Sequence, residues 1–174
     1  MDTTLVITVL ATDRPGVVNT LSETLIAHKA NWVDSRMANL ADKFAGLVQI
    51  SVPTDQLNDL KATLQALHDA DNQLHILMEE AITAVAAEPR SNLSLELLGA
   101  DRPGIIDDVT TALASLNVNI NELETEQREA SMSSELLFYA RLQLGLPEGV
   151  TDDDVKESLE ALSDQLMVDL IFAD

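Results

Sequence analysis

One tetrapeptide, Asp-Arg-Pro-Gly, occurs twice in this chain of 174 residues. The copies span residues 13–16 and 101–104, so they lie 88 positions apart. Each copy follows a short apolar run and precedes an amphipathic helical pattern. A repeat at such a spacing predicts that the chain folds as two copies of one small unit.

The apolar run before each turn predicts a strand, at residues 4–10 and at 92–98. In both runs every second residue is apolar, and a period of two places such a set on one face of a strand. We therefore expect this set to face the core: Leu5, Ile7 and Val9, with Leu93, Leu95 and Leu97 in the second copy.

A helix is expected after each turn. Asp13 is expected to accept backbone N–H bonds at the helix start, and proline suits the first helical turn because its missing donor is not needed there. Apolar residues spaced three and four apart predict one buried stripe on each helix. The stripes comprise Val18, Leu21 and Leu25, and then Ile106, Val109 and Leu113.

The rest of each half predicts a hairpin, a second helix and a last strand. In the first half these are the strands 32–40 and 44–52, a helix with Leu57, Leu60, Leu64 and Leu67 on one face, and the strand 74–78. In the second half they are strands from 120 to about 127 and from about 133 to 144, a helix capped by Thr151 that buries Val155, Leu159, Leu162 and Leu166, and the strand 167–172.

Each half thus has the order β-α-β-β-α-β, which is typical of the ferredoxin-like fold. The predicted class is α+β, with a four-stranded antiparallel sheet and both helices on one face of it. We expect one domain at 1–87 and a second at 92–174, joined by a linker at residues 88–91.

Net charge restricts the partners. The formal charge is −20, and a chain so acidic should repel nucleic acids and anionic membranes. The chain has no cysteine, which excludes disulfides and thiolate metal sites. No signal peptide or membrane-spanning stretch is visible, so we expect a cytoplasmic protein.

The repeated turn is the candidate binding site. Gly16 and Gly104 lack a Cβ, so a ligand can approach the backbone where unpaired helix N–H groups favour a carboxylate. Asn31 and Asn119 open the next strand and offer both a donor and an acceptor. In this fold order Asn31 reaches the turn only from a neighbouring subunit or repeat, so we expect a homo-oligomer. The same tetrapeptide also serves as a plain start for a helix.

No pattern in the sequence predicts catalysis. The G-x-S-x-G, G-x-G-x-x-G and P-loop motifs are absent, and the three histidines lack ligand-like spacing. We read the acidic run 152–154 as helix capping. No enzyme activity, metal or cofactor is expected.

The strand, the turn and the asparagine that follows resemble ACT domains, in both halves. More narrowly, residues 5–8, 11–20 and 34–37 resemble the glycine cleavage system transcriptional repressors, which consist of two ACT domains. The copies differ where Trp32 matches Ile120 and Arg36 matches Glu124, so the sequence leaves open whether both turns bind.

This resemblance implies a non-enzymatic regulator that represses the glycine cleavage operon by contacting a LysR-type activator, with glycine or a similar small amino acid as its signal. It implies that the ligand loops are Asp13, Arg14, Pro15 and Gly16, and Asp101, Arg102, Pro103 and Gly104, with Asn31 and Asn119 opposite them. Two alternatives stay open: a pure protein-interaction module, and a regulatory subunit of an amino-acid metabolic enzyme.

Overall fold

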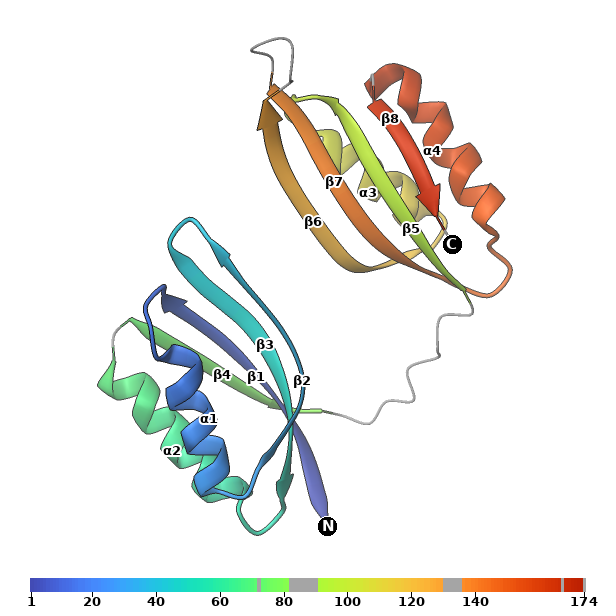
Figure 1. The fold of residues 1–174 in the computed structure, drawn as a ribbon. Helices are drawn as coiled ribbons and strands as arrows, with labels where there is room; N and C mark the ends of the chain where they lie inside the picture. The colour runs from blue at the N-terminus through green and yellow to red at the C-terminus, as the bar shows by residue number, and fades with distance from the viewer. Residues whose placement is uncertain (72, 82–90, 130–135, 167, 174) are drawn as a thin grey trace. The chain divides into compact units, whose positions relative to one another are not determined.

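The chain forms two compact units, Met1–Ala84 and Val85–Asp174. The computed structural model describes residues 1–71, 73–81, 91–129, 136–166 and 168–173 (Figure 1). Residues 88–90 of the predicted linker lie outside the described part, and Ser91 already belongs to a strand. The domain limits 1–87 and 92–174 therefore stay a prediction.

The first unit is one antiparallel sheet with two helices. Its strands follow the order β2-β3-β1-β4, and each neighbouring pair is antiparallel. Both helices cover the same face of this sheet (Figure 1). The elements are β1 (Asp2–Thr12), α1 (Val17–Ala27), β2 (Asn31–Leu40), β3 (Lys43–Pro53), α2 (Leu57–Ala70) and β4 (Leu74–Glu80).

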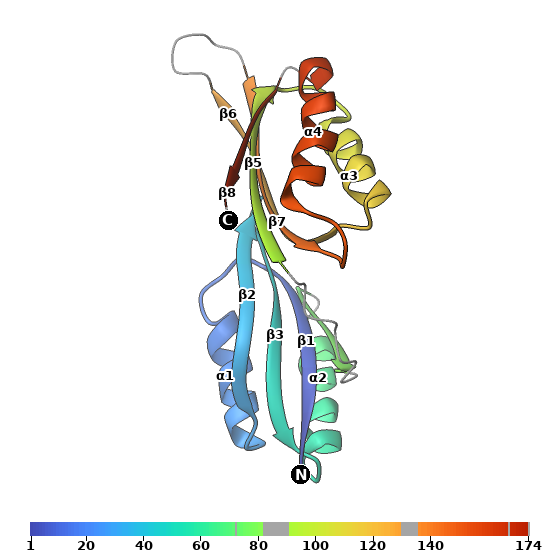
Figure 2. The same ribbon diagram turned by 90° about the vertical axis from the view of Figure 1, so that its right-hand side faces the viewer.

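The second unit repeats this arrangement with the strand order β6-β7-β5-β8. Figure 2 shows its sheet nearly edge-on, with both helices on one side. The elements are β5 (Ser91–Ala100), α3 (Ile105–Ser115), β6 (Asn119–Glu129), β7 (Leu136–Leu146), α4 (Asp152–Leu166) and β8 (Val168–Ala173). The predicted ferredoxin-like α+β fold is confirmed for both units. Part of the second predicted hairpin, residues 130–135, lies outside the described residues.

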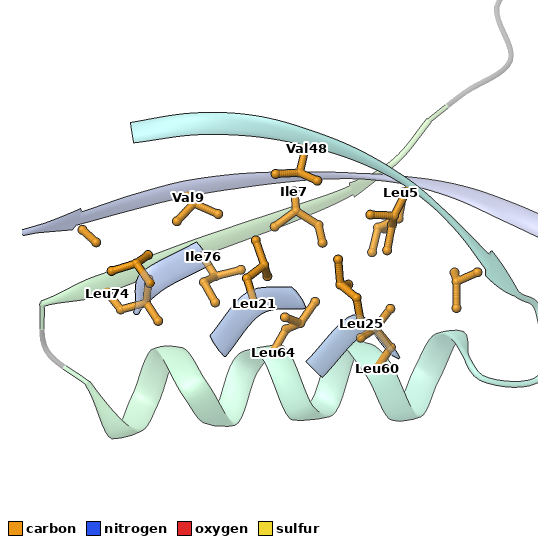
Figure 3. Packing of buried hydrophobic residues seen from close by; sticks show 14 of the residues in the cluster. Leu5, Ile7, Val9, Leu21, Leu25, Val48, Leu60, Leu64, Leu74 and Ile76 are labelled. Carbon is orange, nitrogen blue, oxygen red and sulfur yellow. The ribbon is translucent and has the colours of Figure 1, made fainter. Parts of the chain in front are cut away.

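The core of each unit lies between sheet and helices. The alternating residues of β1 and β5 are buried as predicted, at 0–2% exposure. In the first unit they pack against leucines of α1 and α2 (Figure 3). The prediction for Val18 was wrong, because its side chain is 43% exposed while Val17 is buried. The helix begins at Val17, so the buried stripe runs through Val17, Leu21 and Leu25, and in α3 through Ile105, Val109 and Leu113.

The helix-free face of the first sheet carries exposed leucines. Leu47 and Leu77 both pair with Thr8 across the sheet, and Leu10 follows two residues along β1. These three leucines are 42–66% exposed. We call Leu10, Leu47 and Leu77 the apolar patch. On the second sheet, Arg141 and Ile171 flank Glu96 in the corresponding places.

A reciprocal cap holds the start of α4. The Thr151 hydroxyl accepts a hydrogen bond from the Asp154 N–H at 3.2 Å, and the Asp154 carboxylate accepts from the Thr151 N–H at 2.8 Å and its hydroxyl at 2.7 Å. Thr151 therefore caps this helix, as predicted. The bonds from the Thr151 hydroxyl and backbone N–H lower the pKa of Asp154 below its usual value.

Replacing Thr151 with alanine is expected to lower the Tm of the second unit by a few degrees, because the helix start loses its cap. A carboxyl whose pKa is lowered by folding stabilises the fold above its unfolded pKa of about 3.9, and loses this effect as the pH falls through the folded value. The Tm difference should thus be full at neutral pH and shrink below about pH 4. Calorimetry of both proteins across pH checks this, and a difference that does not change with pH would contradict it.

Candidate functional site

The first copy of the turn leads directly into α1. Gly16 is the N-cap residue with a φ of +99°, in the left-handed region that favours glycine. A Cβ at this position would meet no atom within 4 Å. The helix start has no side-chain cap, so the prediction that Asp13 caps it was wrong. The first N–H groups of α1 are the kind that attracts an anion.

Asp13 instead ties the turn to the β2–β3 hairpin. Its carboxylate accepts a hydrogen bond from Asn39 Nδ2 at 2.5 Å, and its N–H donates to the Asp42 carbonyl at 3.0 Å. The second copy repeats this arrangement, since Gln127 Nε2 donates to Asp101 at 2.6 Å. Asn39 and Gln127 are also 88 positions apart. These two carboxamides at the repeat spacing are a signal in the sequence that the predicted site did not include.

A groove opens beside the first turn, between the N-terminus of α1 and the C-terminus of α2. Its volume is about 430 Å³. Arg14 and Asp71 form an ion pair at this groove, and their side chains are 44% and 26% exposed. We call it the turn groove. Its lining comprises Arg14, Pro15, Gly16, Val17, Thr20, Leu67, Ala70, Asp71 and Leu74.

The second copy of the turn is arranged differently around its arginine. Gly104 has nearly the same φ as Gly16, +94°. Arg102, however, folds back on its own segment, donating to the Asp108 carboxylate at 3.0 Å and to the Pro103 carbonyl at 3.1 Å. Its Nη1 lies 3.7 Å from where a Cβ of Gly104 would be. Asp108 corresponds to Thr20 in the first copy, which carries no charge to draw Arg14 inward.

The structure does not bring Asn31 to the turn of its own unit. Asn31 pairs with Ser51, which in turn pairs with Thr4 near the start of β1, whereas the turn follows the end of β1. Asn119 lies at the start of β6, pairs with Gly145 and donates to Asn121 at 2.7 Å. Asn31 and Asn119 thus lie at the far ends of their sheets, as the predicted fold order required.

Other chemistry finds little support in the described part of the chain. Its histidine, aspartate and glutamate side chains form no group of three that could hold a metal ion. Among the helices described, none combines the length and apolar character that a membrane crossing requires. The turn groove combines a volume of about 430 Å³ with an ion pair beside the repeated turn, so it is our candidate for a small-molecule site.

Comparison with known proteins identifies the first unit. Residues 3–78 match the ACT domain family model. Residues 3–78 are an ACT domain. The second unit has the same element order and sheet topology, so the chain carries two ACT-type domains in tandem, as the sequence predicted.

The whole chain is similar to a named regulator. It is 25% identical over 162 residues to the glycine cleavage system transcriptional repressor of Escherichia coli (strain K12), and the match covers 93% of this chain and 85% of the repressor. The repressor of Shigella flexneri gives the same values. The predicted resemblance to this repressor family is confirmed.

Solved structures share the fold along the whole chain. An unknown protein from Galdieria sulphuraria superposes with a TM-score of 0.82 at 27% identity, covering 99% of this chain and 98% of that one. A candidate glycine cleavage system transcriptional repressor superposes with a TM-score of 0.72 at 21% identity, covering 99% and 97%. The second similarity shows the fold alone.

Proposed function

We propose that this protein is a non-enzymatic, amino-acid-responsive regulator of glycine cleavage genes. It acts in the cytoplasm by binding a LysR-type activator and not DNA, in keeping with its charge of −20. The sequence similarity to the repressor, which extends over 93% of this chain, supports the regulatory role. The observation that carries the sensing role is the turn groove, where both members of an ion pair stand between two helix ends.

The effector loop of this proposal is the turn itself. A ligand carboxylate would bind Arg14 and the free N–H groups at the start of α1, next to Gly16. Asp13 and Pro15 hold the loop in shape. The corresponding residues of the second unit are Asp101, Arg102, Pro103 and Gly104. Because Arg102 is bound by Asp108 there, we place the effector at the first turn. In a homo-oligomer, Asn31 or Asn119 of a second copy would complete the site.

Regulation requires that the ligand bind one state of the protein more tightly than the other. Glycine is the first candidate, since the relative represses the glycine cleavage system. Its binding would change the affinity of the chain for the activator. By reciprocity, the activator must change the affinity for the amino acid by the same factor.

The test measures the Kd between this protein and the LysR-type activator of the host's glycine cleavage genes, with and without saturating amino acid. We expect at least a fivefold change, the lower end of typical allosteric coupling. Isothermal titration of the protein with the amino acid, in the absence of the activator, measures the Kd of the amino acid itself. An unchanged Kd together with no amino-acid binding would refute the sensing role.

The apolar patch favours a second candidate, a protein-interaction module. Leu10, Leu47 and Leu77 expose apolar surface on a sheet face that no helix of the unit covers. Leu47→Arg introduces the residue that stands at the corresponding place in the second unit, Arg141. If the module alone is correct, this change abolishes activator binding, and amino acids have no effect on the wild type. If sensing is correct, amino-acid binding survives in the variant.

A further inference from the structure

The helix-free face of the first sheet is apolar at its centre. Leu47 and Leu77 flank Thr8 in one row across the strands, and Leu10 lies beside Ala45 in the next row. The three leucines of this apolar patch are 42–66% exposed, and Ala45 is exposed as well. Apolar side chains in the middle of a face, with polar ones around them, are the arrangement found in protein–protein interfaces.

The charged groups on this face balance one another. Between Thr4 and Thr12 of β1, the strand registers place four charged side chains on it, namely Arg36, Lys43, Asp34 and Glu79. Counting histidine as neutral, their charges of +2 and −2 cancel, whereas the whole chain carries −20. Like charge therefore repels a second copy of this chain from the molecule as a whole but not from this face.

The corresponding face of the second sheet has a different character. Its middle row has Glu96 between Arg141 and Ile171, and Arg141 forms an ion pair with Glu96 at 3.0 Å. Between Asn92 and Ala100 of β5, this face carries five acidic and two basic side chains, a net charge of −3: Glu96, Glu122, Glu124, Glu126 and Asp169, with Arg128 and Arg141. Two copies of this face would repel each other, so of the two helix-free faces the first is the one suited to self-association.

The size of the first face is sufficient for a dimer. Four strands about 4.8 Å apart, with about nine residues each at about 3.3 Å per residue, cover roughly 500 Å². Two such faces together reach the roughly 1,000 Å² that a specific interface needs. This area lies at the low end for specific complexes, so we expect a dimer that dissociates in the micromolar range.

We propose that two copies of this chain pair face to face through the first sheet. A two-fold axis places the apolar patch of one copy on the apolar patch of the other, as in isologous dimers. The sheets then stack about 10 Å apart, and the leucines of each copy cover those of its partner. The ion pair between Arg36 and Asp34 at 2.8 Å lies on β2, at the polar rim of this interface.

Sedimentation velocity of the full chain across the micromolar range tests this pairing. We expect a monomer–dimer equilibrium in the wild type. Leu77→Arg places a charge in the apolar patch of each copy and should weaken the dimer at least about tenfold. Ile171→Arg is the matched control, because it makes the same change in charge at the corresponding place on the second sheet, where Ile171 is 60% exposed and Leu77 is 66% exposed. It should leave the dimer Kd unchanged.

A third variant separates pairing through the face from pairing along a strand edge. Leu77 lies on the edge strand β4, whereas Leu47 lies on β3, between two other strands. Leu47→Arg should therefore weaken the dimer as much as Leu77→Arg does, with circular dichroism confirming that each variant is folded. A wild-type dimer in Leu47→Arg, or equal weakening by Leu77→Arg and Ile171→Arg, would contradict pairing through this face.

A wild-type chain that stays monomeric throughout would overturn the proposal and leave the apolar patch to a different protein, such as the activator. None of these measurements involves an amino acid, so their failure would leave the proposed sensing role intact.

Discussion

Replacing Leu60 with alanine is expected to lower the free energy of unfolding of the first unit by about 2–5 kcal/mol. Leu60 has no exposed surface and lies within the cluster between α2 and the sheet (Figure 3). The loss combines the transfer energy of the removed carbons with the cost of the cavity left behind. For a unit of this size, the Tm should fall by about 10 °C or more.

The chain contains a single tryptophan and a single tyrosine, one in each unit, so two intrinsic probes can follow this change. Trp32 packs against the core of the first unit, and Tyr139 lies in β7 of the second. We propose that the two units fold independently. Leu60→Ala should then move only the Trp32 transition, and Leu159→Ala, equally buried in α4, only the Tyr139 transition. If either variant moved both transitions equally, the proposed independence would be wrong.

The second large effect concerns the effector site. Arg14→Gln should weaken amino-acid binding about tenfold, because a charge-assisted hydrogen bond to the ligand carboxylate is lost at a half-exposed position. Arg102→Gln is the matched control at the same place in the repeat. Its guanidinium is folded onto its own segment by Asp108 and the Pro103 carbonyl, whereas Arg14 lines the turn groove, so we expect no change in the Kd.

Isothermal titration of both variants, with circular dichroism to confirm folding, separates these outcomes. Equal weakening by the two substitutions would show that both turns bind the effector. If Arg14→Gln bound the amino acid with wild-type affinity, the turn groove would not be the effector site.

The repeated pattern made most of the fold predictable. Alternating apolar residues in β1 and β5 and the leucines of α2 left one consistent assignment in both halves. Adjacent apolar residues did not leave one consistent assignment, because Val17 and Val18 fit a helical stripe almost equally well. The helix begins at Val17, after its N-cap Gly16, whereas we expected Asp13 to cap the helix start.

The site was predictable only in part, because its partners come from far along the chain. Arg14 and Asp71 are 57 positions apart in the sequence, and no local pattern predicts that they form a pair. The difference between the repeats was closer at hand, since Asp108 lies six residues after Arg102 where the first copy has Thr20. Identical tetrapeptides therefore do not imply identical sites when a nearby charge can bind the arginine.

The most direct measurement is an amino-acid titration of the ¹⁵N-labelled chain followed by its backbone amide shifts. We expect the amides of Gly16, Val17 and Asp71 to shift with increasing glycine or another small amino acid, while those of Gly104 and Ile105 stay in place. Shifts at neither turn would contradict an effector site at the turn groove, and equal shifts at both turns would contradict its restriction to the first repeat.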